Sequence, residues 1–165
     1  MNRDKLYLVG FMGAGKTTVA RALGRRLGWR VEDVDERIEA RERRTVAAIF
    51  AQQGEPYFRQ LERQTLVDLL PDRQIVVATG GGTFAEADNR ALMLADAATV
   101  WLDIPLAHVL RRVPTDGRRP LASDRTSLEQ LYFRRHLTYA QAHLQVDGTQ
   151  PVPAVVETIL DWIGY

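Results

Sequence analysis

A glycine-rich string at residues 10–17, Gly-Phe-Met-Gly-Ala-Gly-Lys-Thr, constrains the fold of this chain more than any other feature. A short apolar run at residues 5–10 precedes it and predicts a buried strand, and apolar residues at helical spacing follow it until Gly28. The string has the pattern of a phosphate-binding loop, a glycine and four residues before Gly-Lys-Thr. Glycines let successive backbone N–H groups converge on phosphate oxygens, and the next helix adds its positive N-terminus.

Two side chains of this string carry specific chemistry. Lys16, one of only two lysines in the chain, is expected to reach the β- and γ-phosphates of a nucleotide. The Thr17 hydroxyl is expected to complete the oxygen shell of a magnesium ion. A flexible glycine turn is the alternative, but the position between a strand and a helix favours nucleotide binding.

Strand-like and helix-like segments alternate along the rest of the chain. This alternation predicts an α/β fold, a three-layer sandwich with a central, mainly parallel five-stranded sheet of the P-loop NTPase type. The further strands are expected at residues 29–33, 75–78, 99–103 and 144–147. Helices are expected at residues 105–113, 128–142 and 153–163, with two or three more between residues 38 and 69, interrupted near Gly54-Glu-Pro56.

Length and charge narrow the class of protein. With 165 residues, the chain is expected to form a single domain, 1–165. Its net charge of +1 argues against a nucleic-acid binder, and the absence of cysteine excludes disulfides and zinc–thiolate sites. The first apolar run is too short for a signal peptide or a membrane span, so we expect a cytoplasmic protein without a membrane partner.

Carboxylates at the end of the second expected strand suggest an acceptor site. In Asp33-Val-Asp35, one carboxylate can support magnesium while the other accepts hydrogen bonds from a hydroxyl-bearing substrate. A solvated turn is the alternative, since Asp-x-Asp is common. The chain has no Asn-Lys-x-Asp motif, which a guanine-binding switch would carry. Asp103 follows an expected strand but precedes Ile104-Pro105, so it is a poor candidate for the Walker B acidic residue of a mechanical ATPase.

Two further motifs have both a functional and a structural interpretation. Arg59 and Glu62 lie three residues apart, so they can form a helix ion pair, although an arginine beside Phe58 also suits recognition of a small carboxylate. The glycines at 80–82 follow a strand, where open α/β sheets bind ligands through backbone N–H groups. They can also serve only to turn the chain.

Together these motifs resemble the shikimate kinase family, in the nucleoside-monophosphate-kinase-like branch of P-loop proteins. The resemblance covers nearly the whole chain, and the order and spacing of the motifs are more specific than any one of them. It rests on residues 10–17, Asp33-x-Asp35 before Ile38-Glu39, Ile49-Phe50 before Gly54-Glu55, Phe58-Arg59-x-x-Glu62, Gly80-Gly-Gly82, Arg119-Pro-Leu121, and Arg135 four residues before Tyr139. One departure is Arg43, where many members have glycine.

The resemblance implies transfer of the γ-phosphoryl group of ATP to the 3-hydroxyl of shikimate, with one Mg²⁺, in the pathway to chorismate and the aromatic amino acids. It implies a substrate-binding insertion at about residues 34–62 and a lid at about 113–125. The catalytic residues implied are Lys16, Asp35 and Arg119, and the metal-binding residues are Thr17 and Asp33. The ATP-binding residues implied are Gly13, Ala14, Gly15, Lys16, Thr17, Thr18, Arg112, Arg119 and Pro153. The shikimate-binding residues implied are Asp35, Arg59, Gly80, Gly81, Gly82 and Arg135.

Two alternative functions remain open at this point. One is another P-loop kinase for a small metabolite, such as a gluconate-type or nucleotide kinase. The other is a nucleotide-dependent switch or binding module without an acceptor, whose ATP turnover a macromolecule would stimulate. For the leading interpretation we expect ATP and shikimate as the only ligands besides the metal, no nucleic-acid partner, and a monomer.

Overall fold

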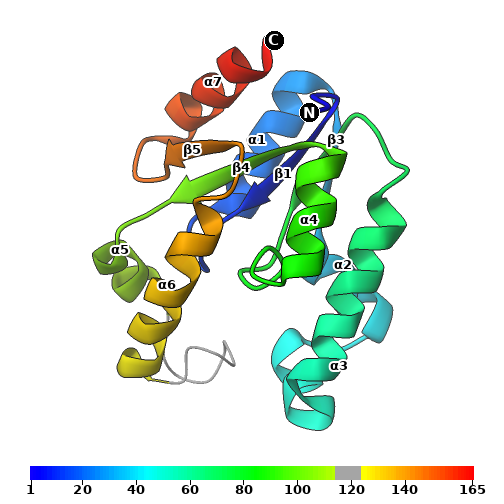
Figure 1. Ribbon diagram of the computed structural model, residues 1–165, viewed down its shortest axis with the longest axis vertical. Coiled ribbons are helices and arrows are strands. Elements are labelled where there is room, and N and C mark those ends of the chain that lie inside the picture. The colour runs from blue at the N-terminus through cyan, green and yellow to red at the C-terminus, as the bar shows by residue number, and fades with distance from the viewer. Residues whose placement is uncertain (114–123) are drawn as a thin grey trace.

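The computed structural model of this chain describes residues 1–113 and 124–165, and strands and helices alternate along it (Figure 1). The strands are β1 (Lys5–Val9), β2 (Arg30–Asp33), β3 (Ile75–Ala78), β4 (Ala98–Asp103) and β5 (Leu144–Asp147). The helices are α1 (Lys16–Leu27), α2 (Val34–Glu42), α3 (Val46–Leu69), α4 (Ala87–Asp96), α5 (Leu106–Arg112), α6 (Arg125–Tyr139) and α7 (Val152–Ile163).

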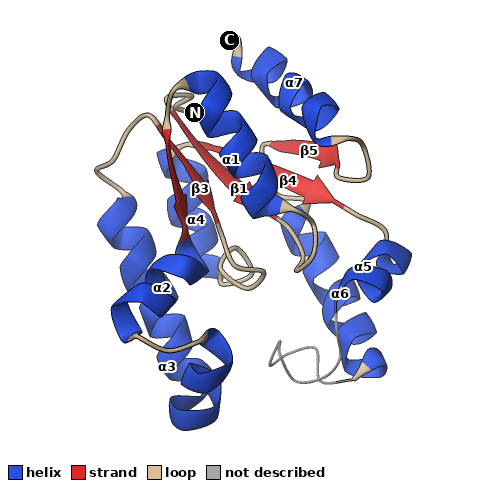
Figure 2. Ribbon diagram, turned by 180° about the vertical axis from the view of Figure 1, so that it is seen from behind, coloured by secondary structure: helices blue, strands red, loops and turns tan. Residues whose placement is uncertain are grey.

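All neighbouring strands of the five-stranded sheet are parallel, and their order is β2-β3-β1-β4-β5. Each parallel connection crosses over the sheet, and the right-handed rule puts crossovers of opposite direction on opposite faces. Accordingly α1 and α7 cover one face, while α4 and α6 lie on the other (Figure 1; Figure 2). Both faces are covered, so every residue of the central strand β1 is buried. The predicted three-layer fold is confirmed.

Most predicted elements lie where the periodicity indicated. Strands β3 and β5 coincide with the predicted segments, and the backbone of Gly54, with a φ of 82°, interrupts α3 at the predicted break. Helix α6 spans Arg125–Tyr139 instead of residues 128–142, because Asp124 caps it by accepting a hydrogen bond from the Ser127 N–H. The sequence analysis assigned no element to the segment that forms α4.

The topology brings the predicted motifs to one edge of the sheet. Parallel strands end at the same edge, so the loops after β1, β2 and β3 lie next to one another there (Figure 2). Helices α2 and α3 pack on each other and form most of the predicted insertion at residues 34–62. Of the predicted lid at 113–125, residues 114–123 lie outside the described residues. Within the described part of the chain, no helix has the length and apolar character needed to cross a membrane.

Candidate active site

The glycine loop between β1 and α1 has a backbone that requires its glycines. Gly10, Gly13 and Gly15 have φ values of 145°, 79° and 88°, in the region that side chains rarely adopt. A β-carbon on Gly10 would also lie 2.7 Å from the carbonyl oxygen of Leu102. Lys16, the first residue of α1, folds its side chain back over the loop, and its Nζ donates to the Gly10 and Phe11 carbonyls at 2.7 and 2.9 Å. The loop is thus a closed turn with a cation above it.

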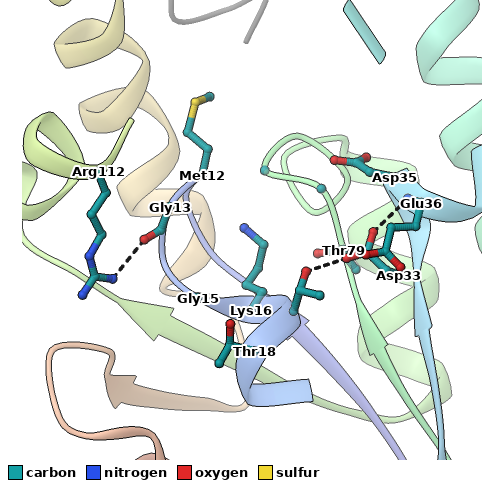
Figure 3. Close-up of a pocket in the computed structure, with 13 residues that line it drawn as sticks. Met12, Gly13, Gly15, Lys16, Thr18, Asp33, Asp35, Glu36, Thr79 and Arg112 are labelled. Atoms are coloured by element: carbon teal, nitrogen blue, oxygen red, sulfur yellow. Dashed lines mark hydrogen bonds between the residues drawn. The ribbon is translucent and has the colours of Figure 1, made fainter. Parts of the chain in front are cut away.

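A cavity of about 470 Å³ opens beside this loop (Figure 3). Figure 3 shows Lys16 from α1 and Asp35 from α2 on the wall of this one cavity. Predicted nucleotide and metal residues therefore share this cavity with part of the predicted acceptor set, whereas Arg59, Gly82 and Arg135 do not line it. The predicted residues that line it are Gly13, Gly15, Lys16, Thr17, Thr18, Asp33, Asp35, Gly80, Gly81 and Arg112.

Thr17 and Asp33 form a hydroxyl–carboxylate pair at the base of the cavity. The Thr17 hydroxyl donates to Asp33 Oδ2 at 2.5 Å, and Asp33 Oδ1 accepts from the Glu36 N–H at the start of α2. Two hard oxygen donors suit magnesium, which keeps most of its shell for water and phosphate. The described residues contain no cluster of three or more acidic, histidine or cysteine side chains that could hold a metal alone. The Thr17–Asp33 pair offers two oxygen atoms to a metal ion and leaves its other positions to further ligands.

Asp35 is a half-buried residue with one buried carboxylate oxygen that is not used within the described part of the chain. Its Oδ1 is buried and has no hydrogen-bond partner among the described residues. Burial, followed by the charges of Glu62 and Asp33, raises the pKa of Asp35 to about 6, although Lys16 opposes the shift. An unpartnered buried carboxylate is unfavourable, so a hydroxyl that donates to it would gain a strong interaction.

The glycines that follow β3 hold three charged side chains in a row. A β-carbon on Gly80 would lie 2.8 Å from Asp35 Oδ1, and one on Gly81 would lie 3.1 Å from Arg135 Nη1. A β-carbon on Gly82 would collide with the Arg59 guanidinium. Glycine is needed at these positions because the side chains approach the backbone itself. The loop therefore presents a carboxylate at one end and two guanidinium groups at the other.

The ion pair that the sequence allowed between Arg59 and Glu62 is present. Arg59 Nη1 donates to Glu62 at 2.5 Å and Nη2 lies 3.2 Å from Glu55. Burial opposes the charge of Arg59, but Glu62 and Glu55 outweigh it and raise its pKa. Glu62, only 1% exposed, also accepts from the Thr83 hydroxyl at 2.7 Å. Glu62 thus fixes the guanidinium beside Gly82.

Arg135 is the inward member of the pair at residues 134 and 135. It is 7% exposed, whereas Arg134 is exposed to solvent. Burial lowers the pKa of Arg135, and the nearby charge of Arg59 lowers it further, while Tyr139 and Glu62 raise it. Among the described residues, no carboxylate forms an ion pair with Arg135. Two guanidinium groups at this end of the loop favour an anionic ligand.

Comparison with known proteins decides the family. The family model described as Shikimate kinase matches residues 12–164. A shikimate kinase from Persephonella marina is 39% identical over 157 residues, which cover 93% of this chain and 96% of the relative. A solved shikimate kinase from Acinetobacter baumannii in complex with shikimate is 35% identical with a TM-score of 0.92, covering 98% of this chain and 93% of that one. The chain belongs to the shikimate kinase family.

The alternative kinases share only the fold with this member of the shikimate kinase family. A gluconokinase from Sinorhizobium meliloti is 15% identical with a TM-score of 0.57, over 98% of this chain and 93% of that one. The expectation of a small-molecule kinase is confirmed by the family, and the gluconate and switch interpretations receive no such support.

The remaining predicted residues of this shikimate kinase family member differ in where they lie: one lines the cavity, some lie away from it, and one is outside the described residues. Arg112, at the end of α5, lines the cavity and donates to the Gly13 carbonyl at 3.1 Å. Pro153 lies exposed in the first turn of α7 and does not line the cavity. Ala14 is buried within the glycine loop. Arg119 lies outside the described residues.

Two contributors to the site, Glu62 and Tyr139, have contacts that their sequence motifs do not reveal. Glu62 was considered only as an ion-pair partner, yet it also lies against Gly80 and influences Asp35. Tyr139 appeared only as a spacing marker, yet its hydroxyl donates to the Gly81 carbonyl. The sequence contains one signal for both residues. Glu62 follows Arg59 by three positions and Tyr139 follows Arg135 by four, so each shares a helix face with a predicted site residue.

Proposed function

We propose that this chain transfers the γ-phosphoryl group of ATP to the 3-hydroxyl of shikimate through the residues of the cavity. The observation that carries this proposal is the glycine loop at 80–82, with Asp35 at one end and Arg59 and Arg135 at the other, beside the phosphate loop. That spacing of charges suits a hydroxy acid. The relative solved as a complex with shikimate supports the choice of acceptor.

On the nucleotide side, the chain supplies positive charge and backbone donors. The N–H groups of residues 13–18 are proposed to bind the phosphates, with Lys16 moving from the Gly10 and Phe11 carbonyls to the phosphate oxygens. Thr17 and Asp33 would hold Mg²⁺, which when bound supplies compensation for phosphate charge. Arg112 and Pro153 are proposed to flank the adenine.

On the acceptor side, Asp35 is proposed to orient the reacting hydroxyl. Its pKa of about 6 leaves it mostly ionised at neutral pH, so Oδ1 can accept the hydroxyl proton as the new bond to phosphorus forms. The transition state of phosphoryl transfer is largely loose, so position and charge compensation matter more than a strong base. Asp35 therefore needs correct placement more than basicity.

The carboxylate of shikimate is proposed to lie between Arg59 and Arg135. Guanidinium groups bind carboxylates through paired hydrogen bonds, and Arg135 has no acidic partner among the described residues that would compete. Arg119 is proposed to close over the phosphates as part of a lid at 113–125, excluding water that would otherwise hydrolyse ATP.

The proposal extends to the organisation of the chain. We propose a single kinase domain over 1–165 that acts as a monomer on two small substrates, with nucleotide and acceptor residues lining one cavity. The nearly balanced net charge of +1 supports the absence of a nucleic-acid partner. We place this activity in the cytoplasm, and light scattering of the purified protein tests the monomer.

The direct test is ADP release by purified protein with Mg-ATP and a candidate acceptor. We expect release with shikimate and none above background with gluconate or a nucleoside monophosphate. Release with either of those and none with shikimate would contradict the proposal.

The acceptor contacts are tested by binding. Arg59→Ala should weaken shikimate binding by about 2 kcal/mol, or roughly thirtyfold, because the ligand carboxylate loses a buried partner. The matched control is Arg41→Ala, which removes an exposed arginine 3.8 Å from Asp68 and should leave binding unchanged. Wild-type affinity in Arg59→Ala, measured by titration calorimetry, would remove Arg59 from the site.

A further inference from the structure

Tyr139 connects helix α6 to the glycine loop at 80–82 through its hydroxyl group. It is the last residue of α6 and is 2% exposed, and its hydroxyl donates to the Gly81 carbonyl at 2.5 Å. A β-carbon on Gly81 would lie 3.8 Å from the Tyr139 oxygen and 3.1 Å from Arg135 Nη1. Helix α6 therefore approaches the loop at this one glycine, with the phenol and the guanidinium side by side.

The same hydroxyl faces Arg135, which lies one turn earlier on the same helix face. Burial lowers the pKa of Arg135, and Tyr139 is the largest influence that opposes this shift. Burial raises the pKa of Tyr139 to about 12, so the phenol keeps its proton near neutral pH. The proton is directed to Gly81, and the oxygen is left to face the guanidinium.

The surroundings of Tyr139 fix the direction of this hydroxyl. Its ring packs against Trp101 of β4 with a centroid distance of 6.0 Å, so the phenol is held between the sheet and the loop. Tyr139, packed on Trp101, thus lies next to Arg135, while Glu62 forms an ion pair with Arg59.

We infer that Tyr139 is a positioning residue for substrate binding, whose hydroxyl ties the Gly81 backbone to the Arg135 guanidinium and sets their spacing for the acceptor's carboxylate. This inference rests on the proposed function. Tyr139 acts through Arg135 and Gly81 and takes no part in phosphoryl transfer. Its loss should therefore affect binding of shikimate and leave turnover at saturation nearly unchanged.

The test is Tyr139→Phe, which removes one oxygen and keeps the ring. We expect the KM for shikimate to rise about tenfold, with kcat and the KM for ATP within about twofold of wild type. The matched control is Tyr132→Phe on the same helix, whose hydroxyl donates to the Ile104 carbonyl at 2.7 Å, away from the glycines at 80–82. The substitution keeps the ring, which packs against Phe11. It loses a similar hydrogen bond and should leave all three constants within about twofold.

A second measurement tests whether Tyr139 acts through Arg135. In the Arg135→Ala background, adding Tyr139→Phe should change the KM for shikimate by less than about twofold, since the guanidinium to be positioned is gone. A full further tenfold rise in that background would overturn the inference.

Each other outcome of these measurements also tests the inference about Tyr139. An unchanged KM for shikimate in Tyr139→Phe, or equal changes in Tyr139→Phe and Tyr132→Phe, would overturn the inference while leaving the proposed function intact. Failure of Tyr139→Phe alone to fold, judged by circular dichroism, would make the hydroxyl structural and would overturn it too. If wild-type protein releases no ADP with shikimate, both proposals fail together.

Discussion

Buried charged groups lie at both edges of the sheet, but the two edges differ in how far these groups are paired within the protein. At the amino edge, where strands begin, Lys5, Tyr7, Arg73 and Asp96 form what we call the amino-edge cluster. At the carboxyl edge, where the strands end, Asp35 and Arg135 lie in or beside the cavity. Lys5 is 0% exposed and Arg135 is 7% exposed, so burial alone does not distinguish the two regions.

The amino-edge cluster satisfies its charges within the protein. Lys5 Nζ lies 2.8 Å from Asp96 and donates to the Leu69 carbonyl at 2.6 Å. Asp96 also accepts from the Tyr7 hydroxyl at 2.6 Å and from Arg73 at 2.8 Å. Burial raises the pKa of Asp96, but these hydrogen bonds outweigh burial and hold the pKa below its usual value. A network of this kind stabilises the fold and leaves little for a ligand. Beside it, Asp4 Oδ1 lies 3.9 Å from Arg73 and has no hydrogen-bond partner among the described residues, but Asp4 does not line the cavity.

At the carboxyl edge the corresponding groups are only partly paired within the protein. Among the described residues, Asp35 Oδ1 has no hydrogen-bond partner and Arg135 has no ion pair, although the Tyr139 hydroxyl faces its guanidinium. The comparison teaches that an incompletely paired polar group that also lines a cavity, more than burial or charge alone, distinguishes the binding site from the structural cluster in this fold. The four predictions below test this distinction from the largest expected effect to the smallest.

Removing the cation of the phosphate loop should abolish activity and spare the fold. In Lys16→Met, kcat should fall by about 10³-fold, because charge compensation on the transferred group is lost. The cooperative urea transition should persist, since the loop backbone keeps its glycine geometry. A steady-state ADP assay measures the loss, and full activity would refute the role of Lys16.

Removing the acidic centre of the amino-edge cluster should do the reverse. Asp96→Ala leaves Lys5 buried without its partner, so the free energy of unfolding should fall by about 3–5 kcal/mol. The kcat/KM for shikimate of the folded protein, assayed at low temperature, should be unchanged. Asp68→Ala is the control, since its loose pair with Arg41 at 3.8 Å is partly exposed and should contribute less than about 0.5 kcal/mol. Equal losses in the two variants would remove the distinction between cluster and surface.

Neutralising the unpartnered carboxylate should stabilise the protein while reducing activity. The pKa of Asp35 in the folded protein, about 6, lies above the ordinary value of 3.8, so its protonated form favours folding. That contribution is fully present below pH 3.8 and is lost as the pH rises through 6. Asp35→Asn should therefore raise the free energy of unfolding by about 1–2 kcal/mol at pH 8, allowing for partial solvent screening.

Urea unfolding of Asp35→Asn and wild type at several pH values measures this gain. The difference between the two proteins should shrink as the pH falls from 8 to 4. The opposite control is Asp124→Ala, which removes the cap of α6 and should destabilise the protein at pH 8. A pH-independent difference for Asp35→Asn would show that the charge is not the cause.

The smallest effect is expected at a position outside both regions. Arg43 ends α2 with a φ of 54°, in the left-handed region that favours glycine. Arg43→Gly should raise the free energy of unfolding by about 0.5–1 kcal/mol without changing kcat or either KM. A change in the KM for shikimate instead would tie the end of α2 to the site.

Local patterns predicted much of this molecule, since they act over a few residues. The phosphate loop, the strand at residues 75–78 and the break at Gly54 all follow from neighbouring side chains and glycine geometry. Helix α4 was missed because its large apolar residues, Leu92-Met-Leu, are consecutive and only Asn89 and Met93 are buried. Periodicity gives no signal in such a segment.

Contacts between distant segments could not be predicted from spacing. Lys5 and Asp96 meet because β1 and α4 converge at the amino edge, and the chain separates them by 91 positions. The contact between Tyr139 and Gly81 likewise depends on how α6 crosses the sheet. The family resemblance supplied Arg59 and Arg135 as a pair, whereas the residues that support them became visible only in three dimensions.

A crystal structure of the protein with ADP, Mg²⁺ and shikimate tests the central claim most directly. The account predicts that the shikimate carboxylate lies between Arg59 and Arg135 and that its 3-hydroxyl lies within hydrogen-bond distance of Asp35 Oδ1. It also predicts that the ADP phosphates lie on the phosphate loop at residues 10–17. Shikimate bound away from the glycines at 80–82, with Asp35 Oδ1 still lacking a partner, would contradict it.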